Sequence, residues 1–76
     1  MKRHTVVSSD IASIAFREDE IDAPTGTLQI EFRKGWIYEY HDVPRTEFLA
    51  LLEAESVGRE FHARIKTKNY AYDRIA

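Results

Sequence analysis

The sequence predicts an α+β fold in which a three-stranded antiparallel meander is followed by two helices packed on one face of the sheet, in the order β-β-β-α-α. In the first half of the chain, apolar residues alternate with polar ones, which is the period of a half-buried strand. In the second half they recur every three or four positions, which is the period of an amphipathic helix. Pro44 separates the halves and suits the first position of a helix.

Three segments of the first half are expected to form strands. The first is Ile11–Arg17, where Ile14 and Phe16 alternate with smaller residues. The second is Thr27–Arg33, whose alternation is the clearest of the three. Its apolar face consists of Leu28, Ile30 and Phe32. The third is Trp36–His41, whose aromatic residues favour extended structure.

The loop between the second and third strands decides where the aromatic residues of the third strand lie. They share one face of that strand: Trp36, Tyr38 and Tyr40. A two-residue loop would place them on the polar side of the sheet. A three-residue loop, Arg33-Lys34-Gly35, pairs them with the apolar residues of the second strand and puts Gly35 at the left-handed position such a loop requires. We therefore expect the aromatic face to belong to the core, while a tyrosine at its rim stays free to stack on a ligand.

The second half is expected to contain two helices and an extended tail. The first helix begins at Pro44, and its apolar stripe consists of Phe48, Leu51 and Leu52. Ser56 is a good N-cap for the second helix. The apolar residues of this second helix are Val57, Phe61 and Ile65. The tail around Asn69–Tyr72 is expected to be extended and to pack back on the domain.

Length and composition limit the class of protein. The chain has 76 residues, which is one small domain. It has no cysteine, so disulfides and thiolate metal sites are excluded, and a reducing cytoplasm is the expected location. No apolar stretch is long enough to span a membrane, and the pattern of a signal peptide is broken by polar residues after the N-terminus.

The formal net charge of −2 hides an uneven distribution. The segment Glu18–Asp22 holds four acids and no base. Its residues lack the spacing of a calcium loop, so a solvated acidic loop is expected there. The segment Val57–Ala76 holds five bases against two acids. A basic region of this kind is able to attract a polyanion even though the whole chain is not basic.

The start of the second helix is one candidate phosphate site. In Ser56-Val57-Gly58-Arg59, the free backbone N–H groups at the helix start suit an anion, Gly58 allows close approach and Arg59 adds a charge. The alternative is structural, with Ser56 acting only as a cap and Gly58 fitting a tight corner.

Basic residues along the same helix form a second candidate. Arg59, His62 and Lys66 are spaced as one helical face, and Arg64 and Lys68 as a neighbouring face. Such a face suits phosphate contacts. The alternative is an ordinary solvated surface opposite the apolar residues of the helix.

The sequence offers little for catalysis or metal binding. The three histidines, His4, His41 and His62, lack the spacing of a zinc site, so no metal is expected. The pair His41-Asp42 would orient an imidazole as a base, but no nucleophile or phosphate loop accompanies it. We expect neither an enzyme nor a cofactor.

Several of these motifs occur together in an order that resembles one known family. A first strand ending Ile14-Ala15-Phe16 is followed by Thr27–Phe32, by the pair Tyr38-x-Tyr40, and by the helix start Ser56-x-Gly58-Arg59. Over roughly residues 7–72 the chain resembles the KTSC domain, named for a C-terminal extension of some lysyl-tRNA synthetases and also found as a small stand-alone protein in bacteria and their phages. The longer acidic connection at Glu18–Ala23 departs from the family pattern. The resemblance implies no catalytic residue, and its context beside a tRNA synthetase suggests RNA binding.

The sequence therefore indicates two alternative functions. The first is a small non-catalytic module that binds RNA or another nucleic acid. Its phosphate contacts would be Ser56, Gly58, Arg59, His62, Arg64, Lys66 and Lys68, and its stacking residues Tyr38, Tyr40 and Tyr72. The alternative is a protein-interaction adaptor, which an exposed patch around Trp36, Tyr70 and Tyr72 would favour.

Overall fold

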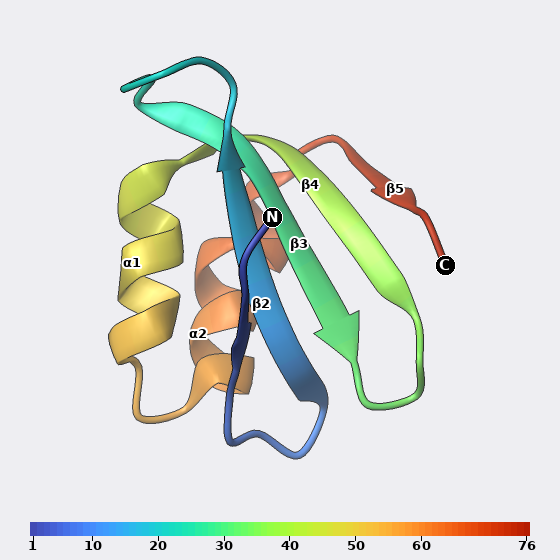
Figure 1. Cartoon of the computed structure of the whole chain (residues 1–76). Helices are drawn as coiled ribbons and strands as arrows, with labels where there is room; N and C mark the ends of the chain where they lie inside the picture. Colours follow the sequence, from blue (N-terminus) through green and yellow to red (C-terminus); the bar gives the residue numbers. More distant parts are fainter.

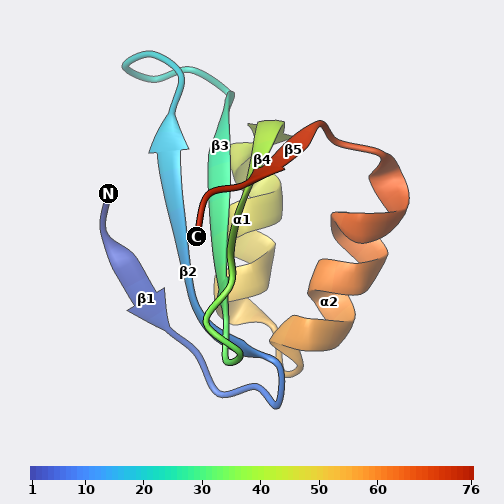
Figure 2. The ribbon, with the colours of Figure 1, turned by 90° about the vertical axis from the view of Figure 1, so that its right-hand side faces the viewer.

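The protein forms a five-stranded antiparallel sheet with both helices packed on one face (Figures 1 and 2). The computed structural model describes residues 1–76, and the strands lie side by side in the order of the sequence. The elements in chain order are β1 (Arg3–Thr5), β2 (Ile11–Glu18), β3 (Thr25–Phe32), β4 (Ile37–Pro44), α1 (Arg45–Glu53), α2 (Val57–Arg64), the 3-10 helix η1 (Lys66–Lys68) and β5 (Tyr72–Arg74).

The expected three-stranded sheet is too small, because two short edge strands extend it. β1 pairs with β2, and β5 pairs with β4, each over three residues. Both segments are mostly polar and exposed, so neither shows the alternation that marks a half-buried strand. β5 begins at Tyr72, the last residue of the tail that was expected to be extended and to pack back, and its pairing extends the sheet past β4 (Figure 1).

The hairpin between β3 and β4 has the expected register. Ile30 pairs with Tyr38 and Leu28 with Tyr40. The N–H of Phe32 donates to the Trp36 carbonyl at 2.8 Å, which closes the three-residue loop. Gly35 has φ +102°, a conformation that residues with a Cβ rarely adopt.

The core lies between the sheet and the two helices. Its 11 buried residues come from β2 to β4, from both helices and from the residue that follows α2: Ile11, Ile14, Leu28, Ile30, Tyr40, Val43, Phe48, Leu51, Val57, Phe61 and Ile65. The core residues of the strands lie on the face of the sheet that the alternation of apolar residues predicted to be buried. Leu52 was expected in the stripe of α1 but lies on its exposed side, as Leu49 does.

α2 ends earlier than the spacing of its basic residues suggested. Its last residue is Arg64, and the chain then tightens into the 3-10 helix η1. The hydroxyl of Thr67 donates to the Ala63 carbonyl at 2.7 Å, and Asn69 turns the chain into β5 with a left-handed φ of 59°. Lys66 and Lys68 therefore do not continue the helical face of α2.

No helix covers the opposite face of the sheet (Figure 2), and side chains on that face form polar contacts with one another. The hydroxyl of Ser13 donates to Glu31 at 2.7 Å, and the Gln29 amide donates to Glu39 at 3.1 Å. The ring of His41 lies 2.9 Å from the carboxylate of Asp73. The one ring in this polar network is the imidazole of His41, so this face lacks the row of several aromatic rings on which RNA-binding sheets stack bases.

Candidate functional site

Aromatic side chains gather on the helix-facing side of the β4–β5 edge. Tyr38 and Tyr72 stack with their ring centroids 5.7 Å apart and an interplanar angle of 19°. Tyr40 lies 5.5 Å from Tyr72 and packs edge-on against Phe61 of α2. The register between β4 and β5 produces this cluster, because it places Tyr40 directly opposite Tyr72.

The cluster passes from the core to the surface. Tyr40 is buried, Tyr38 is half-buried and Tyr72 is 59% exposed. Trp36, at the start of the same hairpin arm, is 44% exposed. Tyr40 thus anchors the cluster in the core, while Tyr72 and Trp36 have exposed ring surface.

Two adjoining hollows open onto these rings. The tryptophan hollow has a volume of about 320 Å³ and is lined by Ser9, Asp10, Phe32, Arg33, Lys34, Trp36, Tyr38, Tyr40 and Lys66. The tyrosine hollow has a volume of about 480 Å³ and is lined by Tyr38, Tyr40, Ile65, Lys66, Asn69, Tyr70 and Tyr72. Because they share Tyr38, Tyr40 and Lys66, we treat them as one aromatic groove.

The groove is surrounded by positive charge. Three cations and one acid, Asp10, line the tryptophan hollow, and Lys66 is the one ionic side chain of the tyrosine hollow. The guanidinium of Arg74 lies 4.8 Å from the centroid of the Trp36 ring, and the ammonium of Lys34 lies 5.9 Å from it. Neither Lys34 nor Lys66 takes part in an ion pair within the chain. Their charges are available to an anion.

Two tyrosines of the groove, Tyr40 and Tyr70, have a raised pKa. Burial, followed by the neighbouring phenols of Tyr72 and Tyr38, raises the pKa of Tyr40 to about 12. Burial and then the charge of Glu47 also raise the pKa of Tyr70. The one fully buried side-chain polar atom without a partner is Arg45 Nε, so none of these hydroxyls is sealed in the core without a partner.

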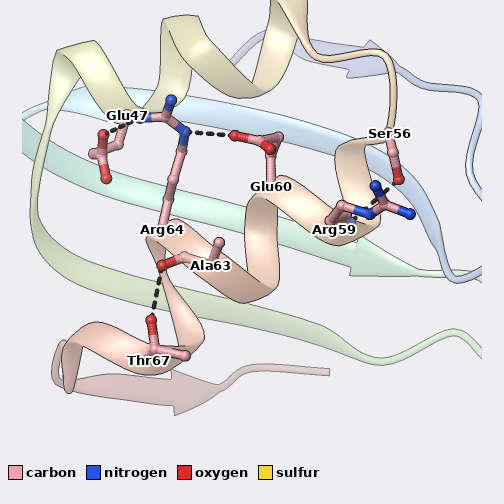
Figure 3. A network of polar contacts seen from close by, with 7 residues as sticks. All are labelled: Glu47, Ser56, Arg59, Glu60, Ala63, Arg64 and Thr67. Carbon is pink, nitrogen blue, oxygen red and sulfur yellow. Dashed lines mark hydrogen bonds and ion pairs between the residues drawn. The ribbon is translucent and has the colours of Figure 1, made fainter.

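The hollow at the start of α2 has a net negative charge, whereas the aromatic groove has a net positive one. Ser56 caps the helix by accepting from the Arg59 N–H at 3.4 Å, as the sequence predicted (Figure 3). The hollow beside it, of about 430 Å³, is lined by three glutamates and two arginines. These ionic residues are Glu53, Glu55, Glu60, Arg59 and Arg64. A phosphate at this helix start would meet net negative charge.

Arg64 is occupied by glutamates. Its guanidinium donates to Glu60 at 2.9 Å and to Glu47 of α1 at 3.0 Å (Figure 3). The hydrogen bond to Glu60, and then that to Glu47, hold the pKa of Arg64 above its usual value. Arg64 therefore links the two helices, and two carboxylates already balance its charge.

The structure divides the residues chosen from the sequence into two groups. Tyr38, Tyr40, Tyr72 and Lys66 meet in the aromatic groove. Outside it lie Ser56, Gly58, Arg59, His62, Arg64 and Lys68. A Cβ at Gly58 would lie 3.5 Å from the Ser8 hydroxyl, so this glycine packs beside the loop after β1.

Sequence reasoning missed three cations that surround the groove, Arg33, Lys34 and Arg74. The first two occupy the hairpin loop directly before Trp36, a signal that the sequence does contain. Arg33 is also tied to the loop after β1, because its Nε donates to the Ser8 carbonyl at 2.6 Å. Arg74 reaches Trp36 through the β4–β5 pairing, which the sequence did not reveal.

A further hollow lies at the acidic end of the molecule. It has a volume of about 470 Å³ and is lined by Phe16, Glu18, Glu20, Ile21, Arg45, Phe48 and Leu49. Arg45 pairs with Glu18 at 2.6 Å, which fixes the base of the acidic loop on α1.

No group of three or more histidine, aspartate or glutamate side chains is placed to hold a metal ion. None of the helices has the length and apolar character needed to cross a membrane.

Comparison with known proteins agrees with this fold. An uncharacterized protein of Stutzerimonas stutzeri strain A1501 is 39% identical over 75 residues, which are 99% of each chain. A lysine–tRNA ligase of Trichormus variabilis is 38% identical over 60 residues, which are 79% of this chain and 10% of that protein. The crystal structure of a KTSC domain protein from Yersinia pestis matches with a TM-score of 0.83 and 33% identity, covering 99% of this chain and 97% of that one. The model of the KTSC domain family matches residues 7–70, and the chain therefore belongs to the KTSC domain family.

Proposed function

We propose that this KTSC domain is a small non-catalytic module that binds single-stranded RNA in the aromatic groove. The observation that carries the proposal is the combination of exposed rings with unpaired cations. Trp36 and Tyr72 offer ring surface for bases, and Lys34 and Lys66 offer charge for phosphates. Single-strand binding proteins use the same two components.

Two further observations support RNA as the ligand class. The groove is the most cationic of the hollows described, whereas the α2 start and the acidic loop are net negative. A segment similar to this chain also occurs within a lysine–tRNA ligase. A non-catalytic role fits the one close histidine–carboxylate pair, His41 and Asp73, which lies on the open face of the sheet away from the groove.

The test is fluorescence anisotropy of a labelled single-stranded RNA against the purified protein at low and moderate salt. Affinity is expected to fall with salt, because phosphate contacts release counterions. Trp36→Leu is expected to weaken binding about tenfold, which is within the range for the loss of one stacked base.

Arg64→Met is the matched control, because this arginine is held by Glu47 and Glu60 outside the groove. It is expected to leave the RNA affinity within about twofold. Equal losses in Trp36→Leu and Arg64→Met, or binding that is independent of salt, would refute the proposal.

The adaptor hypothesis concerns the same surface. Trp36 and Tyr72 are exposed and Tyr70 is half-buried, so this patch also suits an apolar protein partner. Four cationic side chains, Arg33, Lys34, Lys66 and Arg74, favour the polyanion. Absence of RNA binding at low salt, where charge attraction is strongest, would leave the protein partner as the better explanation.

A further inference from the structure

The two hollows of the groove meet at one lysine. Lys66 lines both, together with Tyr38 and Tyr40, while each hollow has one exposed ring of its own, Trp36 in one hollow and Tyr72 in the other. Volumes of about 320 and about 480 Å³ each fall in the range of small-ligand pockets. The groove thus alternates aromatic surface, positive charge and aromatic surface.

Lys66 is held at this junction by the fold around it. The buried Ile65 precedes it, and η1 begins at Lys66 itself. Its side chain is exposed and forms no ion pair within the chain. Tyr40 lines both hollows as well, and it keeps its proton above neutral pH because its pKa is raised to about 12. An unpaired ammonium group and a tyrosine hydroxyl that line the same hollows both offer hydrogen bonds to one phosphate.

One exposed ring in each hollow and one cation shared by both correspond to the groups of a nucleotide chain, in which a phosphate links one base-bearing sugar to the next. Resting on the proposed RNA-binding function, we infer that the groove holds two successive nucleotides, with one base in each hollow and the linking phosphate on Lys66. The base in the tryptophan hollow stacks against Trp36, and the base in the tyrosine hollow stacks against Tyr72.

The experiment uses the single tryptophan of the chain as the reporter, because Trp36 lines one of the two hollows. Its fluorescence is followed while the protein is titrated with three probes. These are the dinucleotide UpU, the same dinucleotide with an uncharged methylphosphonate linkage, and uridine 5′-monophosphate. UpU is expected to bind about tenfold more tightly than the uncharged analogue, which is within the range for a charge-assisted hydrogen bond.

Variants at one position then assign the preference for a charged linkage. Lys66→Met is expected to abolish the difference between UpU and its uncharged analogue, and Lys66→Arg to retain it. Lys68→Met is the matched control, because Lys68 lies on the same 3-10 helix but lines neither hollow. It is expected to retain the full difference. Lys66 is exposed, so its replacement leaves the core intact.

The outcomes separate this inference from the proposed function. If longer RNA binds but UpU and the uncharged analogue bind equally, the assignment of the linking phosphate to Lys66 is wrong while RNA binding stands. If uridine 5′-monophosphate binds as tightly as UpU, the groove holds one nucleotide rather than two. If neither UpU nor longer RNA binds at low salt, both the inference and the proposed function are wrong.

Discussion

Tyr40 belongs to both the core and the groove. Its ring packs against Phe61 of α2, and the same ring borders both hollows. Only 6% of the residue is exposed, so protein surrounds most of its side chain. Desolvation disfavours the phenolate, and this accounts for the raised pKa.

The raised pKa of Tyr40 predicts a loss of stability at high pH. An unperturbed tyrosine titrates near 10, and Tyr40 titrates at about 12 in the folded chain. Below pH 10 the folded and the unfolded chain both keep the proton of this hydroxyl. Between pH 10 and about pH 12 the unfolded chain loses the proton while the folded chain keeps it. The free energy of unfolding is therefore expected to fall as pH rises through this window, by up to about 3 kcal/mol from this group.

Urea denaturation of the wild type and of Tyr40→Phe at a series of pH values measures this effect. The phenylalanine variant keeps the ring and removes the titrating group, so its stability is expected to fall less steeply. Lysines and the other tyrosines titrate in both proteins, and the comparison cancels them. Identical pH dependence in the two proteins would show that burial does not perturb this hydroxyl.

At the scale of the elements, the sheet is shaped by close backbone approach at the start of β3. Gly26 pairs with Glu18 on one side and with Val43 on the other, next to a bulge in the β3–β4 ladder. A Cβ at Gly26 would overlap the carbonyl oxygen of Arg17 and lie 2.8 Å from the ring of Phe16. The acidic loop and α1 are both connected to strands at this point.

Gly26→Ala is expected to lower the free energy of unfolding by about 2 kcal/mol or more, since the backbone of β2 must move to admit the methyl group. Gly58→Ala is the matched control. A Cβ there meets Ser8 only at van der Waals distance, and alanine is the better helix former, so stability is expected to stay equal or to rise by up to about 0.5 kcal/mol. Chemical denaturation measures both variants, and equal stabilities would contradict this account of β3.

At the scale of the whole molecule, opposite charges occupy different regions. The acidic loop connects β2 with β3, while the cations of the groove come from the β3–β4 hairpin, η1 and β5. The molecule measures 32 × 26 × 24 Å, which exceeds the Debye length of about 10 Å at 0.1 M salt. The local charge of the groove, rather than the net charge of −2, is therefore expected to govern an encounter with an anion.

The small size of the domain makes its stability sensitive to ligand. A chain of 76 residues is expected to be only marginally stable. RNA at about 100 times its dissociation constant adds about 2.7 kcal/mol to the free energy of unfolding if it binds only the folded state. For a domain of this size the melting temperature is then expected to rise by about 10 °C or more.

Differential scanning fluorimetry with increasing single-stranded RNA measures this rise. Trp36→Leu is expected to need higher RNA concentrations for the same shift. A melting temperature that does not change with RNA in the wild type would mean that RNA does not select the folded groove.

The sequence revealed the parts of the fold that depend on local pattern. The position of Gly35 and the alternation in β3 were enough to predict the hairpin register and the side on which Tyr40 lies. β1 and β5 were missed because a three-residue edge strand needs no apolar alternation.

The site was harder to predict, because charges are brought together by tertiary structure. The spacing within α2 suggested free cations, but Glu47 of α1 reaches Arg64 from another helix. The three glutamates near Ser56 likewise come from α1, the helix–helix connection and α2. Spacing along one element does not reveal such partners.

The order of the strands determines from which edge of the sheet an attached polypeptide would approach the groove. The N-terminal strand β1 and the C-terminal strand β5 form opposite edges of the sheet. A polypeptide joined at the N-terminus would arrive at the edge most distant from the groove. One joined at the C-terminus would continue from Ala76, whose carbonyl accepts from Ile37 and Arg74, past the ring of Trp36. Attachment through the N-terminus is therefore the arrangement that leaves the groove accessible when such a domain is part of a larger protein or carries a purification tag.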